Sequence, residues 1–222
     1  MSDQRVIAFS TFLKLVELDD QKKMAALRGF KRGGGFNYWR PLQVLSSEII
    51  KNQLTLEDLS SRLDTFAKGH QKKYNERALL KILLWKSKRK VNARRRPERF
   101  EYRLGSSGFT VKFEPELSFE LNGSNYLAHV WATNTPTLSE TSLSVGLYLL
   151  KLAARKNGLI DYNYLILDTV KDRTFGEFDI LANSEDMLND QISILGDLWS
   201  DSVPDRRRGE RSEDLLAPPP AF

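Results

Sequence analysis

The chain has 222 residues and a net charge of +5, and its 41% hydrophobic and 28% charged residues are typical of a globular protein. It has no cysteine, which excludes disulfides, thiolate metal sites, iron–sulfur clusters and a cysteine nucleophile. Its apolar stretches are too short to cross a membrane and no secretory signal pattern is present, so we expect a soluble, cytoplasmic protein without membrane contact.

Helical periodicity dominates the first ninety residues, which predict four or five helices. Three consecutive glycines, 33–35, end the second helix, and Pro41 is well placed as the first residue of the third. Thr55 and Asn75 are predicted N-caps of the last two. The predicted helices begin near Val6, Asp20, Pro41, Leu56 and Glu76.

The pattern changes at the basic run 86–99, where Pro97 ends any helix. Residues 1–99 carry 23 Lys and Arg against 10 Asp and Glu, whereas residues 100–222 carry 11 against 19. We therefore predict a basic helical region at 1–90, a basic linker at 91–104, an acidic α/β domain at 105–202 and a disordered tail at 203–222.

Beyond this boundary the sequence predicts a β-hairpin and then a mixed α/β arrangement. Residues 111–121 alternate apolar and polar side chains, Pro115 marks a bulge or an edge, and Asn122-Gly123 is a strong signal for a two-residue turn. The later elements are a return strand at 126–132, a helix at 139–156 that Thr137 or Ser139 can cap, strands at 162–170 and 175–180, and a helix at 184–199. The predicted fold class is α+β, a helical region followed by a small mixed α/β domain.

The hairpin carries acidic residues on one strand face. With a two-residue turn Glu116 lies opposite His129 and Glu120 opposite Asn125, whereas a four-residue loop places Glu116 opposite Trp131. Carboxylates and an imidazole on one face can bind Mg²⁺ or Mn²⁺. The alternative is an exposed amphipathic face without a ligand.

Clustered Lys and Arg suit a phosphate backbone, because each contact releases counterions. One cluster follows the helix 76–88 into the basic run, and a second surrounds the glycines 33–35, close to aromatic residues. The alternatives are a solvated linker, stabilisation of a helix C-terminus, or attraction between the two halves. The candidate nucleic-acid contacts are Arg28, Lys31, Arg32, Arg40, Lys73, Arg77, Lys81, Lys88, Arg89, Lys90, Arg94, Arg95 and Arg96.

The order of elements over about 109–180 resembles the core of the restriction-endonuclease-like PD-(D/E)XK nucleases, and Pro115-Glu116 resembles their first metal-binding element. The resemblance implies a metal-dependent nuclease with Glu116 and Glu120 as ligands and His129 as base or ligand. The strand where (D/E)-X-K should fall, 127–131, reads Leu-Ala-His-Val-Trp and has neither acid nor lysine.

Together these features favour a nucleic-acid-binding or accessory protein that is not an enzyme and needs no cofactor. The first alternative is a divergent nuclease that uses Mg²⁺ or Mn²⁺. The second is a protein-interaction module that docks a protein partner through the acidic half or through the tail 203–222, while the basic half balances the charge. Asp168, at the end of a predicted buried strand, is a further acid of interest, although most such acids cap turns. The sequence leaves the oligomeric state open.

Overall fold

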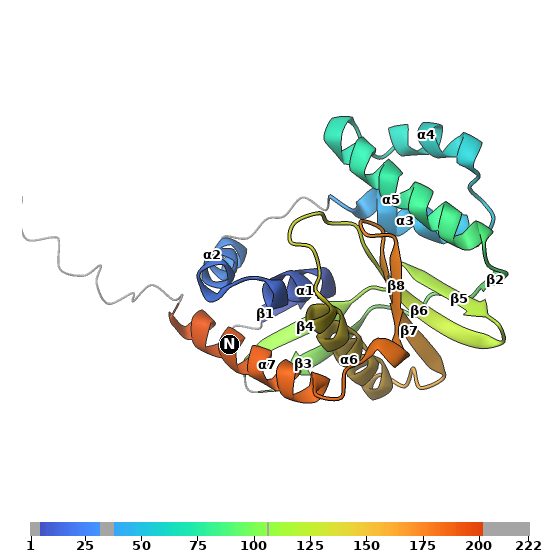
Figure 1. Ribbon diagram of the computed structural model, residues 1–222. Helices are drawn as coiled ribbons and strands as arrows, with labels where there is room; N and C mark the ends of the chain where they lie inside the picture. Colours follow the sequence, from blue (N-terminus) through green and yellow to red (C-terminus); the bar gives the residue numbers. More distant parts are fainter. Residues whose placement is uncertain (1–4, 32–37, 106, 202–222) are drawn as a thin grey trace, which may run out of the picture.

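The computed structural model describes residues 5–31, 38–105 and 107–201 (Figure 1). It confirms the predicted α+β class: α1 to α5 precede all the described strands except β1, and helices and further strands follow the hairpin. The helices are α1 (Phe9–Glu17), α2 (Asp20–Lys31), α3 (Arg40–Ile50), α4 (Leu56–Asp64), α5 (Gly69–Ser87), α6 (Glu140–Lys156) and α7 (Ser184–Asp201), with a 3-10 turn η1 (Glu177–Asp179).

The strands form two sheets. The smaller has the order β1-β4-β3, with β1 parallel and β3 antiparallel to the central strand. The larger has the order β2-β5-β6-β7-β8, in which only the β6–β7 pair is parallel. The strands are β1 (Arg5–Ala8), β2 (Val91–Ala93), β3 (Phe100–Leu104), β4 (Phe109–Phe113), β5 (Leu117–Leu121), β6 (Ser124–Trp131), β7 (Tyr162–Asp168) and β8 (Arg173–Gly176).

Helices cover both faces of the five-stranded sheet (Figure 1). Along β6, Leu127 and Trp131 belong to a core shared with α1, α6 and α7, whereas Ala128 and Val130 belong to a core shared with α3, α4 and α5. The strand therefore buries alternate side chains on opposite faces, as its pleat requires. The basic helices and the acidic α/β part share both cores.

The strand predicted at 111–121 is divided between the two sheets. β4 ends at Phe113 and β5 begins at Leu117, so the segment Glu114-Pro115-Glu116 connects one sheet to the other. Pro115 has no backbone N–H for a ladder and suits such a break. In β5, Leu117, Ser118 and Phe119 are all buried, because helices cover both sheet faces.

Three local predictions are wrong. The helix predicted from Val6 is a strand over Arg5–Ala8 before α1, because pairing with β4 overrides a helical pattern that begins early. Asn75 does not cap a helix, since α5 begins at Gly69 and buries this residue. The strand predicted at 175–180 is the last part of β8 followed by η1.

The basic stretch 91–104 differs from the predicted linker, because both its ends are strands. Val91 begins β2, Phe100 begins β3, and Leu104 ends β3 with a fully buried side chain. The apolar residues at these positions are buried in the two strands, and most of the basic residues of the stretch lie between the strands. The predicted disordered tail, 203–222, lies outside the described residues.

Several turn and cap predictions are confirmed. Asn122 and Gly123 both have positive φ, 52° and 79°, as a two-residue hairpin turn requires. The side chains of Thr55 and Ser139 accept hydrogen bonds from the first turns of α4 and α6. No helix in the described ranges has the length and apolarity needed to cross a bilayer.

Candidate functional site

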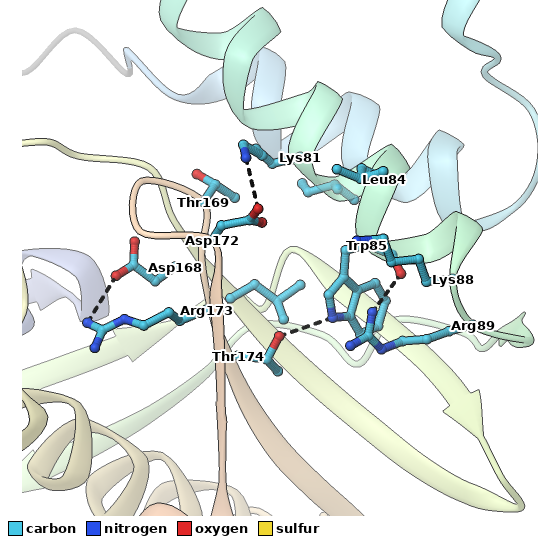
Figure 2. A pocket seen from close by; sticks show the side chains of 12 residues that line it. Lys81, Leu84, Trp85, Lys88, Arg89, Asp168, Thr169, Asp172, Arg173 and Thr174 are labelled. Atoms are coloured by element: carbon cyan, nitrogen blue, oxygen red, sulfur yellow. Dashed lines mark hydrogen bonds and ion pairs between the residues drawn. The ribbon is translucent and has the colours of Figure 1, made fainter.

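A cationic groove lies between the C-terminal half of α5 and the β7–β8 hairpin (Figure 2). It has a volume of about 150 Å³, and the residues that line it include four basic residues, Trp85 and two acids. The four basic residues are Lys81, Lys88, Arg89 and Arg173, and the acids are Asp168 and Asp172. Positive charge therefore exceeds negative charge around the groove.

Two contacts hold the walls of the groove together. Lys81 Nζ lies 2.9 Å from Asp172 Oδ2, and this bond lowers the pKa of the Asp172 carboxyl. Trp85 Nε1 donates to Thr174 Oγ1 at 3.1 Å. Both contacts join the basic helical part to the acidic α/β part (Figure 2), so some attraction between the two halves is present.

The remaining cations of the groove are more available. Lys88 is exposed and forms no ion pair with any described residue. The Arg89 guanidinium lies 4.7 Å from the centroid of the Trp85 ring, where the ring face favours a cation. The guanidinium of Arg173, in contrast, points away from Trp85 (Figure 2) and lies 3.7 Å from Asp168 and 4.8 Å from the centroid of the Phe175 ring.

The structure brings together three of the predicted nucleic-acid contacts, Lys81, Lys88 and Arg89, in this groove. No pattern in the sequence suggested Arg173, which lies in the acidic half and belongs to the groove lining through β8, with its guanidinium directed at Asp168. Other predicted contacts are exposed elsewhere: Lys73 and Arg77 on α5, Lys90, Arg95 and Arg96 around β2, Arg28 on α2 and Arg40 at the start of α3. Lys31 ends α2, and Arg32 lies outside the described residues.

Most of these cations are not neutralised by the acidic half. Among the predicted contacts whose side chains the structure describes, Lys81 pairs with Asp172 and Arg94 pairs with Glu120, and no other forms an ion pair with a described residue. Ion pairs between the two halves therefore neutralise only a small part of the positive charge on these residues.

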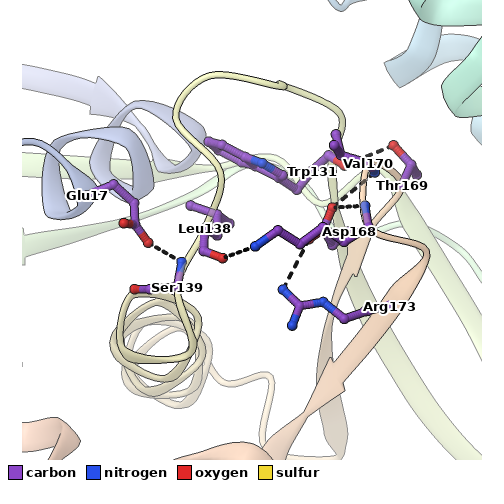
Figure 3. A network of polar contacts seen from close by, with 9 residues as sticks. Glu17, Trp131, Leu138, Ser139, Asp168, Thr169, Val170 and Arg173 are labelled. Atoms are coloured by element: carbon purple, nitrogen blue, oxygen red, sulfur yellow. Dashed lines mark hydrogen bonds and ion pairs between the residues drawn. The ribbon is translucent and has the colours of Figure 1, made fainter.

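Asp168 caps the β7–β8 turn (Figure 3). Its Oδ1 accepts hydrogen bonds from the backbone of Val170 and Lys171, both at 3.0 Å. Thr169 donates through its backbone and its hydroxyl to the carbonyl of Trp131, each at 2.9 Å. These bonds fix the hairpin that carries Arg173, so the role of Asp168 in this structure is to hold a turn.

The second candidate site is a buried Glu116–His129 pair. The observed register pairs Leu117 with Ala128 and Glu120 with Asn125, which confirms the two-residue-turn alternative and places Glu116 across from His129. Glu116 Oε2 lies 2.9 Å from His129 Nδ1 and accepts a further bond from Val130 N at 2.9 Å. Both side chains are more than nine-tenths buried, so the exposed-face alternative is wrong for Glu116.

Glu120 does not belong to this site. Its carboxylate pairs with Arg94 beside β2, and four residues of extended strand separate it from Glu116 by about 13 Å. The described residues contain no cluster of three or more His, Asp or Glu side chains that could hold a metal ion. The predicted set of Glu116, Glu120 and His129 is therefore not assembled in this structure.

The pair lies in the wall of a pocket of about 210 Å³. The apolar walls include Phe9 of α1, Leu42 of α3 and the aromatic Trp39. Glu114 and Lys112, which form an ion pair at 2.5 Å, lie in the same lining. His129 Nε2 and Trp131 Nε1 are both buried without a hydrogen-bond partner.

Comparison of the chain with protein-family models, with curated proteins and with solved structures found no match.

Proposed function

We propose that this protein binds nucleic acid through the phosphate backbone and is not an enzyme. The observation that carries the proposal is the groove where Lys88 and Arg89, which form no ion pair with a described residue, lie beside Lys81 at the C-terminal end of α5. These three cations face the carboxylate of Asp172, and only Lys81 is paired with it. A polyanion supplies the missing negative charge.

The surroundings of the groove extend the same surface. Lys73 and Arg77 precede it along α5, at a spacing that puts them on one helix face with Lys81. Arg95 and Arg96 follow in the exposed segment after β2. Phosphate contacts of this kind position a strand and carry little base preference.

Salt dependence of binding to fluorescent DNA and RNA oligonucleotides tests this proposal. The double variant Lys88→Glu with Arg89→Glu should weaken binding at low salt and reduce the slope of log affinity against log salt by about 2, since each phosphate contact contributes about 0.9. A matched control is Arg155→Glu with Lys156→Glu, which reverses two adjacent exposed cations at the end of α6. Equal loss of affinity in both variants would show that only net charge matters.

The run after β2 needs a more selective test. Arg94 pairs with Glu120, so its reversal also breaks a contact within the protein. Reversal of Arg95 and Arg96 alone avoids that effect. We expect this pair of changes to weaken binding without altering the unfolding midpoint, and unchanged binding would remove the segment from the interface.

A divergent nuclease is the second candidate, because Glu116 and His129 meet in a pocket and the order of elements resembles that of the PD-(D/E)XK nucleases. Labelled DNA and RNA incubated with Mg²⁺ or Mn²⁺ test it, with Glu116→Ala beside the wild type. Cleavage lost in that variant would favour the nuclease, whereas cleavage at the wild-type rate would point to a contaminant. A protein partner for the tail and a cytoplasmic location stay predictions.

A further inference from the structure

The pocket beside Glu116 and His129 has an unmet hydrogen-bonding requirement. Oε2 of Glu116 accepts from Val130 N, and its contact with His129 Nδ1 assigns the ring proton to Nδ1. In the neutral imidazole this leaves Nε2 as an acceptor, and that atom is buried without a partner. Leaving a buried polar atom unsatisfied is unfavourable, so a ligand or an ordered water is expected there.

A second unmet group lies in the same lining. Trp131 is 1% exposed, and its Nε1, which can only donate, also has no partner. A ligand that satisfies both groups needs a hydrogen-bond donor for His129 and an acceptor for Trp131. Water can do this too, but water does not account for the apolar walls formed by Phe9, Trp39 and Leu42.

The size of the pocket restricts the ligand. Drug-sized molecules occupy pockets of roughly 300–1,000 Å³, and this pocket is smaller, at about 210 Å³. It therefore suits a ring system with donors and acceptors on its edge. Lys112 in the lining is paired with Glu114, so the positive charge for a phosphate attached to such a ring comes from Arg40, exposed beside Trp39.

We propose that this pocket binds a nucleobase, either in a free nucleoside phosphate or as an unpaired base of a strand, with His129 Nε2 as acceptor for a base N–H. Recognition of unpaired bases commonly combines aromatic contact with hydrogen bonds to the base edge. The choice of a nucleobase rests on the proposed function, whereas the pocket and its two unmet groups do not.

NMR of the full chain with ¹⁵N-labelled histidine tests the inference. The chain contains two histidines, His70 and His129, so the spectrum of the His70→Asn variant assigns both sets of ring signals. Titration with adenosine, guanosine, cytidine and uridine monophosphates should shift the His129 ring nitrogens saturably for at least one base and leave His70 unmoved. If none of the four shifts His129 at millimolar concentration, the pocket holds water only and the inference falls.

The variant His129→Asn separates binding from folding. An asparagine amide can reproduce the Nδ1–H bond to Glu116 but places no acceptor where Nε2 lies. We expect an unchanged fold and an affinity for the mononucleotide lower by about tenfold, the value of one hydrogen bond. Equal affinity in this variant would place the nucleotide elsewhere and overturn the inference.

Oligonucleotides distinguish the two sources of the base and the two proposals. A strand that shifts His129, and an otherwise identical strand with an abasic site that does not, identify the base of a strand as the occupant. Mononucleotide binding at His129 without any strand binding at low salt would support a free nucleotide and defeat the proposed function. Salt-dependent strand binding with His129 unmoved by strands and mononucleotides would leave the proposed function standing and defeat this inference.

Discussion

Glu116 and His129 are 13 residues apart in the chain, and their side chains meet at 2.9 Å inside the protein. Glu116 lies in the segment between the two sheets, and His129 lies on β6. The Asn122-Gly123 turn fixes the register that brings them together. Because the same carboxylate oxygen also accepts from Val130 N, the pair is part of the folded core as well as of a pocket.

Glu116→Ala should lower the free energy of unfolding by about 3 kcal/mol, because it leaves two buried donors without an acceptor. Urea denaturation measures this loss. Glu120→Ala is the control, since it breaks the half-exposed pair with Arg94 and should cost at most about 1 kcal/mol. Similar losses in the two variants would contradict the conclusion that two buried donors depend on Glu116.

Gly146→Ala should destabilise the protein by about 1–3 kcal/mol through overpacking. A Cβ at this position of α6 would lie 2.3 Å from Leu13 Cδ2 on α1, too close for any carbon pair. Gly29→Ala on α2 meets no atom within 4 Å and should instead stabilise by up to about 1 kcal/mol. Thermal unfolding of both variants should therefore show shifts of opposite sign.

Asn75→Ala should cost about 2–3 kcal/mol, because this buried amide joins α5 to the start of α3. Its Oδ1 accepts from Leu42 N at 3.0 Å, and its Nδ2 donates to Tyr38 O at 3.1 Å and Gln71 O at 2.8 Å. Asn92→Ala on the exposed side of β2 is the control and should change stability little. Chemical denaturation measures the loss of stability in both variants. Equal losses would contradict the conclusion that the buried hydrogen bonds of Asn75 stabilise the protein.

Tyr164 should make stability fall at high pH. Burial and the nearby Glu177 raise the pKa of its phenol from 10.0 to about 12. Between these values the unfolded chain releases the proton and the folded protein keeps it, so the stabilisation present below pH 10 is lost progressively towards pH 12.

Tyr164→Phe removes this titration. The variant loses the bond from the phenol to Leu159 O, so it should be less stable than the wild type at pH 8 by about 1 kcal/mol. The deficit should shrink as the pH rises above 10, because only the wild type then loses stability at this position. Unfolding curves from pH 8 to 11 measure the difference, and a constant deficit would contradict the shift.

Local signals in the sequence were sufficient for several features. The Asn122-Gly123 turn determined the hairpin register, and the capping residues Thr55 and Ser139 located two helices. These predictions succeeded because each depends on backbone geometry within a few residues. The early strand β1 was missed for the opposite reason, since its partner β4 lies about a hundred residues away.

The same distinction between local signals and long-range packing applies to the two candidate sites. The sequence by itself determined the fold class and the charge division and limited the partner of Glu116 to His129 or Trp131, because composition and strand alternation are properties of the chain. Only the tertiary structure decided that Glu120 turns to Arg94, that the β7–β8 hairpin lies beside Lys88 and Arg89, and that helices cover the hairpin on both faces. The physical reason is that burial and convergence depend on which distant segments pack together, and no local pattern records that choice.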